Sequence, residues 1–527
     1  MKHPLSPHHL LRRGLILTAI FLAALILAIA SLMGARVLPQ GQLVTRIKAA
    51  SRFLVDEHPY DSPLSRALHL PFTNYSWSRD NGTDSTMLSV MLPQKGKPAL
   101  YSAMDDEWAQ LSHLYKPHQF PQQSVVALSA RLTGMRPVEP VSYARYWHGY
   151  QVITQPLLRI MSYAQTRILN MLLLTLCLIA TLIVIARFVS RTVAVAFTAV
   201  LLLAGCYIVP LSWQFVAVSY IALAGMVAAA LLGRKLNWPR FDLELFFILG
   251  IVTVFFDFFT IPLITLGLPL LMILVMMWQD SARRAAFARD SRKEVLRATS
   301  AWLSGYALFW VAKWVVASVL LKQNVVQNAI QEIFLRGGTR IAPAGTLAGS
   351  AHRSNVAPSG LLSVFTMRFE SVFKNLAALI PGRMIPLELA LRSALAVVLI
   401  ALAFALWSLL RSKRRAAGAT LCSARQASSF LVVGAFPLVW YFVLANHSIL
   451  NYWFTYRLLV VTLFALALFF ICTLVPTPAP DVPGTADFIE FDSMINLRPA
   501  QNNRSRSVEA PALQEKIKEL IAEVVHG

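Results

Sequence analysis

The sequence predicts an all-α integral membrane protein with about ten transmembrane helices and a large mixed extracytoplasmic domain between helices 1 and 2. Hydrophobic residues make up 56% of the 527 residues and charged residues only 14%, whereas soluble domains carry about 25% charged residues. The hydrophobic residues come in runs of about 20, the length that crosses a bilayer as a helix. The cations are concentrated in the short loops between these runs.

The first apolar run covers residues 14–33 and follows a basic N-terminus. It is longer than the apolar part of a typical signal peptide, which favours an uncleaved anchor. Small residues at 30–35 leave cleavage open as an alternative. We assign residues 1–35 to this anchor helix.

Nine further apolar runs follow at 168–186, 193–211, 215–232, 243–261, 263–279, 300–321, 392–410, 430–446 and 458–475. They predict helices 2–7 within residues 166–321 and helices 8–10 within 393–475. Two long segments without such a run remain, 36–165 and 322–392. A proline-rich stretch then begins a tail at 476–527, where the spacing of apolar residues predicts a short helix near the end.

The distribution of cations predicts the orientation. With the N-terminus inside, the short inner loops hold 16 Lys and Arg, and the short outer turns hold only Arg457. Because cations are retained on the cytoplasmic side, we expect a multi-pass protein of the cell membrane with both termini cytoplasmic. The same rule explains the net charge of +22, so we expect membrane lipids and no nucleic acid as partners.

The second outer segment, 322–392, is rich in glycine and predicts irregular loop over much of its length. Within it, residues 361–379 are apolar but interrupted by Arg368, Glu370 and Lys374. This pattern fits an amphipathic helix on the outer membrane surface. It fits an ordinary packed helix equally well.

Acidic residues of the first outer segment supply candidates for catalysis and metal binding. Asp84 stands where a polar Asn-Gly turn leads into an apolar segment, and a partly desolvated carboxylate there can act as a general base. Asp105 and Asp106 are adjacent carboxylates suited to a divalent cation, Mg or Mn, that keeps several waters. Neither pattern has the spacing of a diagnostic motif, and most surface acids are merely solvated.

Basic and aromatic residues precede the second predicted helix in Tyr143-Ala-Arg-Tyr-Trp-His-Gly-Tyr150. Aromatic residues are common at the membrane interface without any further role. Arg145 and His148 go beyond that pattern, since arginine binds phosphate with two parallel hydrogen bonds and histidine exchanges protons near neutral pH. Together they predict a site for a lipid phosphate.

Two further candidates lie near the outer ends of apolar runs. Asp257 is the only charge in a run of about 34 residues, and an ionisable group at membrane depth is a functional candidate by default. The alternative is a buried acid paired with Arg or Lys from a neighbouring helix. His447 and Arg457 flank the last outer turn and would face the same layer as His148.

The overall plan resembles the GT-C class of membrane glycosyltransferases, and parts of it resemble uncharacterised bacterial multi-pass membrane proteins. The resemblance consists of a first helix, a large outer loop, many further helices and a late outer turn with the residues Asn446-His-Ser and Phe454-Thr-Tyr-Arg457. It implies a catalytic acid in the first outer loop, at Asp84 or alternatively at Asp56 or Asp61. The sequence lacks the D-x-D or E-x-D pair expected soon after the first helix.

The leading hypothesis is therefore a glycosyl transferase of cell-envelope assembly, with a polyprenyl-phosphate sugar as donor and a glycan or lipid as acceptor. Asp84 would be the catalytic base, and Arg145, His148, Asp257, His447 and Arg457 would bind substrate. A transporter or lipid flippase is the first alternative, with Asp257 and Lys313 in a polar pathway. A non-catalytic envelope protein is the second.

Overall fold

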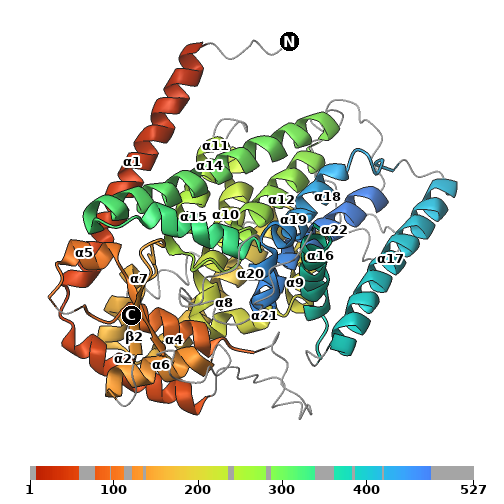
Figure 1. Cartoon of the computed structure of the whole chain (residues 1–527). Coiled ribbons are helices and arrows are strands. Elements are labelled where there is room, and N and C mark those ends of the chain that lie inside the picture. Colours follow the sequence, from red (N-terminus) through yellow and green to blue (C-terminus); the bar gives the residue numbers. More distant parts are fainter. Residues whose placement is uncertain are drawn as a thin grey trace, which may run out of the picture. The chain divides into compact units, whose positions relative to one another are not determined.

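The computed structural model describes residues 7–57, 78–94, 96–111, 122–134, 138–235, 242–280, 287–338, 361–382, 386–417 and 421–475. Most of these residues are helical (Figure 1). They belong to one compact unit, Met1–Thr485. The tail helix expected near the C-terminus lies outside the described residues, as does Asp61.

Among the described residues, six helices are long and apolar enough to cross a membrane. They are α1 (Pro7–Val37), α8 (Tyr163–Phe188), α10 (Val216–Lys235), α14 (Phe287–Leu321), α17 (Pro386–Ala416), and α22 (Leu459–Leu474) together with the short helices before it from Tyr452. Each contains or overlaps one of the predicted apolar runs. The chain is thus helical, with segments that suit a bilayer.

The other four predicted runs form shorter helices: α9 (Arg191–Leu203), α11 (Asp242–Phe256), α12 (Ile264–Gln279), and α18 (Ser428–Gly434) with α19 (Phe436–Val443). The predicted run at 193–211 is helical only as far as the end of α9. It is interrupted at Gly205, which has a left-handed backbone with φ 64°. Two short 3-10 helices follow it, η2 (Cys206–Leu211) and η3 (Trp213–Phe215). Local turns therefore divide apolar runs that the sequence predicted as continuous helices.

Glycine residues allow a close contact between two helices of the bundle. A Cβ atom added to Gly250 of α11 would lie 2.3 Å from the carbonyl oxygen of Trp302, and one added to Gly305 of α14 would lie 2.2 Å from that of Phe247. The backbones of α11 and α14 therefore touch, as small residues allow in tightly packed helix pairs of membrane proteins.

We keep the names first and second outer segment, taken from the predicted orientation, for residues 36–165 and 322–392. The first outer segment contains both helices and strands. Its elements are α2 (Gly41–Asp56), α4 (Asn81–Val90), α5 (Ala99–Met104), β1 (Glu107–Leu111), α6 (Gln122–Thr133), β2 (Val138–Ser142) and α7 (Gln151–Ile160). The two strands pair antiparallel, with Glu107 opposite Ser142.

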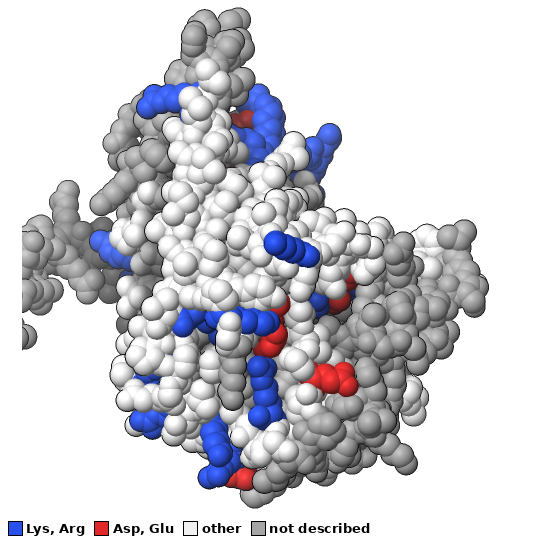
Figure 2. All heavy atoms as spheres, turned by 60° about the vertical axis from the view of Figure 1, so that its left-hand side comes forward, with Lys and Arg blue, Asp and Glu red and all other residues white. Residues whose placement is uncertain are grey.

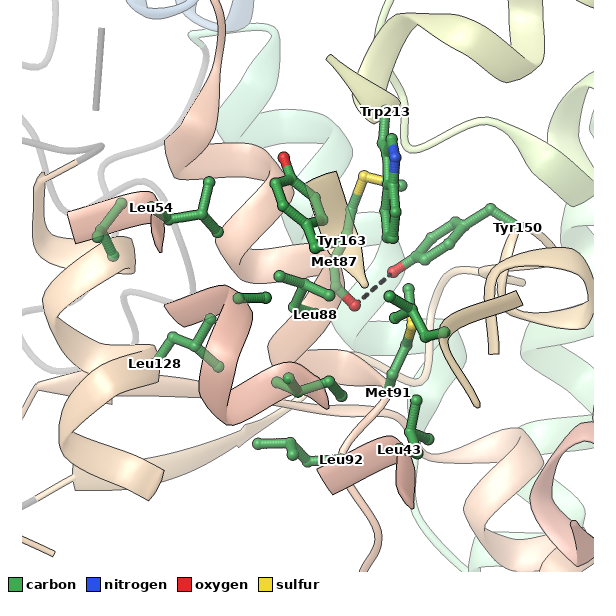
Figure 3. Close-up of a cluster of buried hydrophobic side chains, with 14 residues drawn as sticks. Leu43, Leu54, Met87, Leu88, Met91, Leu92, Leu128, Tyr150, Tyr163 and Trp213 are labelled. Carbon is green, nitrogen blue, oxygen red and sulfur yellow. Dashed lines mark hydrogen bonds between the residues drawn. The ribbon is translucent and has the colours of Figure 1, made fainter. Parts of the chain in front are cut away.

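The core of this segment includes side chains from the apolar helices. Leu43, Leu88 and Leu128 are fully buried and belong to the same cluster as Tyr163 of α8 and Trp213 of η3 (Figure 3). The outer segment is therefore packed directly onto the helical bundle and shares a hydrophobic core with it.

Helices also form in the second outer segment, where the sequence predicted mainly irregular loop. α15 (Val325–Arg336) begins at Asn324, whose side chain accepts a hydrogen bond from the backbone N–H of Gln327, a typical N-cap. α16 (Leu361–Ala378) follows the undescribed residues 339–360. The last outer turn consists of α20 (Ala445–Leu450), α21 (Tyr452–Thr455) and η4 (Tyr456–Leu458).

Charge is unevenly distributed over the surface. On the face in Figure 2, a largely uncharged band with few cations lies below a group of cations near the top, and mixed charges gather on the lower part. An uncharged band of this kind suits contact with hydrocarbon.

Candidate functional site

Asp84 is held in the first turn of α4 by residues from two other elements, α8 and η3. Its carboxylate accepts hydrogen bonds from the hydroxyl of Tyr163 at 2.5 Å and from the backbone N–H groups of Trp213 and Gln214, each at 3.2 Å. The side chain is fully buried. Asp84 thus joins the outer segment to α8 and η3.

Burial raises the pKa of Asp84 to about 6, and the positive charge of Arg167 and the hydrogen bond from Tyr163 limit that rise. The guanidinium of Arg167 donates to Glu57 at 2.7 Å, to Asn81 at 3.0 Å and to the Tyr163 hydroxyl at 2.7 Å. A carboxyl group in this range can exchange a proton near neutral pH. The alternative acid, Asp56, is exposed.

Arg457 is connected to Asp80 through Trp453. Asp80 caps α4 by accepting from the backbone N–H of Thr83 and accepts a further hydrogen bond from the indole of Trp453 at 3.1 Å. The carbonyl of Trp453 in turn accepts from Arg457, whose guanidinium lies over the Phe215 ring at 4.4 Å. Burial raises the pKa of Asp80, and the charge of Arg457 opposes the rise.

The adjacent carboxylates Asp105 and Asp106 are directed to different partners. Asp105 accepts from the hydroxyl of Ser142 at 2.5 Å and lies 3.7 Å from the ammonium of Lys97. Asp106 pairs with Arg36 and accepts from the amide of Gln151 at 3.0 Å. Burial raises the pKa of Asp106, and the charge of Arg36 opposes it.

This arrangement does not fit a divalent cation. Each carboxylate is already paired with a cationic side chain, and the pair shares no ligand sphere. In the described parts of the chain, no group of three or more His, Cys, Asp or Glu side chains is placed to hold a metal ion. The expectation of Mg or Mn at Asp105 and Asp106 finds no support in their geometry.

Arg145 and His447 are connected through two residues of α15. The Nη2 atom of Arg145 lies 3.5 Å from a carboxylate oxygen of Glu332, and the other oxygen accepts from Nε of Arg336 at 3.0 Å. The Nη1 atom of Arg336 lies 2.8 Å from Nδ1 of His447. We call this row of four side chains, Arg145, Glu332, Arg336 and His447, the arginine bridge.

The arginine bridge carries a net positive charge. Burial raises the pKa of Glu332, but the charges of Arg145 and Arg336 outweigh burial and hold the pKa below its usual value. Burial and the charge of Arg336 lower the pKa of His447 well below its usual value, so the imidazole is neutral. Two guanidinium groups therefore share one carboxylate.

His148 is a buried imidazole enclosed by aromatic rings. Its backbone has φ 51°, which is uncommon for any residue other than glycine. The rings of Tyr143 and Phe258 lie 5.1 and 5.3 Å from the imidazole ring. Burial, with the nearby charges of Lys313 and Arg145, lowers its pKa well below the usual value.

Asp257 stabilises the loop at residues 257–260, which packs against both His148 and His447. Its carboxylate accepts from the backbone N–H of Thr260 at 3.0 Å and from the Thr260 hydroxyl at 2.7 Å. The loop thus formed places Phe258 against His148 and Phe259 against His447, with ring centroids 5.0 Å apart in the second pair. These partners come from its own loop, whereas the sequence offered a cation on a neighbouring helix.

The candidate residues consequently form two groups. Arg145, His148, His447 and the Asp257 loop surround the rings of Tyr146 and Phe259. Asp84 and Arg457 belong to the other group. Rings separate the two groups: Phe454 lies between His447 and Phe215, at 6.1 Å from each.

Sequence reasoning missed Glu332 and Arg336, because it assigned most of their segment to irregular loop. A signal was present in Asn324, which starts a helix, and in the four-residue spacing of Glu332 and Arg336, which suits an ion pair along a helix. Lys313 was considered for a polar pathway with Asp257. Its ammonium instead donates to the carbonyls of Ala103 and Met104, at the end of α5.

The comparisons with known proteins concern only the tail. Residues 479–524 match a family model described as protein of unknown function, DUF5674. That segment is a small part of the chain and lies outside the described residues. No curated protein and no solved structure matches the chain.

Proposed function

We propose that this chain is a membrane glycosyltransferase of cell-envelope assembly that binds a polyprenyl-phosphate-linked sugar at the arginine bridge. The observation that carries the proposal is a set of buried donors without acceptors. Nε of Arg145, Nε2 of His447 and Nε1 of Trp440 are all buried and have no hydrogen-bond partner among the described residues. Buried donors are rarely left unpaired in folded proteins.

These donors lie around the same pair of rings. The guanidinium of Arg145 is 5.3 Å from the centre of the Tyr146 ring, and the rings of Trp440 and His447 are 5.5 and 5.0 Å from that of Phe259. Tyr146 and Phe259 are themselves 6.3 Å apart. A single bound group near these rings could accept from several of the donors.

A phosphate group has the chemistry that this site would bind. The two guanidinium groups outnumber the one carboxylate, so an anion would balance the charge. Arginine also matches phosphate in geometry, with two parallel N–H donors. A phosphodiester between a sugar and a lipid supplies such an anion with an attached hydrocarbon chain.

The proposed reaction transfers the sugar to a hydroxyl of a glycan or lipid acceptor. The hydroxyl oxygen attacks the anomeric carbon, the bond from that carbon to the phosphate oxygen breaks, and the polyprenyl phosphate leaves. Negative charge grows on the leaving phosphate, where Arg145 and Arg336 would stabilise it. The hydroxyl proton passes to a base, and Asp84, whose pKa burial raises to about 6, is the candidate. This role requires the acceptor hydroxyl to reach the Asp84 group, on the other side of the Phe454 ring from the arginine bridge.

The proposed topology has ten crossings, with both termini in the cytoplasm. The four shorter helices would cross together with their adjoining turns, as η2 extends the path of α9. The excess of cations in the loops on one side supports this orientation.

A non-catalytic envelope protein is the second candidate. It is favoured by the three hydrogen bonds that Asp84 already accepts, a pattern that also suits an acid with a purely structural role.

One experiment separates the two candidates. Envelope sugar incorporation is measured in cells that produce the wild type, Asp84→Asn or Asp56→Asn, with membrane insertion and folding verified for each. The transferase proposal expects loss of incorporation for Asp84→Asn alone. Retained incorporation with Asp84→Asn would exclude Asp84 as the base, and retention with Arg336→Gln as well would favour the non-catalytic protein.

A further inference from the structure

α16 has its polar side turned toward the protein. Ser371 and Asn375 are fully buried. The Ser371 hydroxyl donates to the carbonyl of Tyr441 at 2.9 Å, and the Asn375 amide donates to that of Ser448 at 3.1 Å. Thr455 donates in turn to Asn375 at 2.7 Å. These contacts fix which face of α16 is turned inward.

The opposite face of α16 is apolar and uncovered. Phe365, Phe369 and Phe373 follow one another at intervals of four residues, so they lie along one side of the helix. They are 52, 54 and 42% exposed. The helix is therefore the reverse of a surface helix in water, which buries its apolar side and exposes its polar side.

This apolar face continues onto the neighbouring helix α17. The hydroxyl of Ser393 on α17 donates to the carbonyl of Phe373 at 3.1 Å, so the two helices are side by side (Figure 1). Val397, Val398 and Leu399 of α17 are consecutive and all exposed, so several sides of that helix are bare. Only 6% of the apolar window of α17 is buried.

The charged residues of α16 do not interrupt the phenylalanine face. The side chain of Arg368 lies at the C-terminal end of α19, where it donates to the carbonyls of Phe442 and Val443. The ammonium of Lys374 lies over the ring of Tyr452 at 4.6 Å. Glu370 is exposed along one edge of the phenylalanine face, where it could reach water or headgroups.

We propose that the phenylalanine face of α16, formed by Phe365, Phe369 and Phe373, is a lipid-binding surface. The helix lies in the membrane interface, with the three rings among the hydrocarbon chains and the Glu370 edge at the headgroups. The exposed apolar surface of α17 lies beside the phenylalanine face and is continuous with it. Because α17 is suited to hydrocarbon, we infer that lipid also covers the phenylalanine face. This inference does not depend on the proposed transferase activity.

Fluorescence quenching in proteoliposomes tests the proposal. The full chain with its four cysteines replaced by alanine receives a single Phe369→Cys substitution and an environment-sensitive dye on that thiol. Lipids with a nitroxide on the acyl chain quench from the hydrocarbon, and iodide quenches from water. Leu172→Cys on α8 and Thr45→Cys on α2, both at exposed positions, provide the lipid and water references.

The expected result is quenching of the Phe369 label by nitroxide lipid to the extent seen at Leu172, with little effect of iodide. Strong quenching by iodide would place the face in water and overturn the proposal. Protection from both quenchers would show that protein covers the face, in another copy or a partner, and would overturn it too. If Phe369→Cys does not fold, Phe365→Cys takes its place with the same criteria.

Discussion

Nη1 of Arg336 donates a hydrogen bond to Nδ1 of His447 at 2.8 Å. A guanidinium can only donate, so Nδ1 must be an unprotonated acceptor, and the ring proton of the neutral imidazole is on Nε2. The contact therefore determines the tautomer of His447 and leaves its Nε2–H available to a ligand.

Replacing Arg336 by glutamine removes a cation that opposes protonation of His447. We expect the pKa of His447 to rise toward its usual value of about 6.5, because burial alone then lowers it. Titration of labelled histidine by NMR in nanodiscs measures the change. Arg368→Gln is the matched control, and an unchanged His447 pKa in Arg336→Gln would contradict the assignment.

Replacing Glu332 by glutamine leaves the two arginines without their shared carboxylate. Loss of one partner of a buried pair costs about 3 kcal/mol, so thermal unfolding should occur at a lower temperature than in the wild type. An added anion should compensate, and inorganic phosphate is expected to raise the unfolding temperature more in the variant than in the wild type. Glu370→Gln, an exposed acid on α16, should show neither effect.

Asp84 makes stability depend on pH in a defined direction. Its folded pKa is raised to about 6, above the unfolded value, so its stabilising contribution is complete below about pH 4 and is lost as pH rises through 6. A shift of about two pKa units corresponds to about 3 kcal/mol. Relative to Asp84→Asn, the wild type should lose stability between pH 4 and 7 in thermal unfolding. A pH-independent difference would contradict the raised pKa, and Asp56→Asn should follow the wild type.

The contact between α11 and α14 cannot accommodate a methyl group. Gly250→Ala and Gly305→Ala would each force a Cβ against a backbone carbonyl of the other helix, and overpacking of this kind costs about 1–3 kcal/mol. Both variants should unfold at lower temperature in detergent. Gly34→Ala, with no atom within 4 Å of the added carbon, should be unaffected. Equal unfolding temperatures for all three variants would mean that α11 and α14 can move apart at little cost in free energy.

Part of this arrangement follows from the sequence because it depends on local patterns. Apolar runs predict helices well, since each run must satisfy its own backbone groups in hydrocarbon. The same patterns placed Arg145 and His447 on one predicted side of the membrane, and the structure connects the two through α15. The breaks near Gly205 and Ala435 were not predicted, because glycine and alanine also occur inside helices.

The partners of each charged residue could not be predicted, since they depend on tertiary packing. Asp105 and Asp106 are neighbours in sequence, yet Lys97 contacts one and Arg36 the other. Arg457 lies in the same outer turn as His447, but its side chain stacks on Phe215 from a distant helix. Spacing along the chain carries no information on such contacts.

The contacts of the outer segment also have a consequence for the order of synthesis. Asp84 accepts two hydrogen bonds from the backbone N–H groups of residues 213 and 214. The carbonyls at the end of α5 accept hydrogen bonds from the ammonium of Lys313. At 5–20 residues per second, roughly ten to fifty seconds separate the synthesis of Asp84 from that of Lys313. In the proposed topology residues 36–165 would then be outside the membrane. Asp84 would lack its contacts with residues 213 and 214 for the first part of that time, and the end of α5 would lack Lys313 for all of it. The final structure of this segment would therefore wait for the later helices to insert, although it is made first.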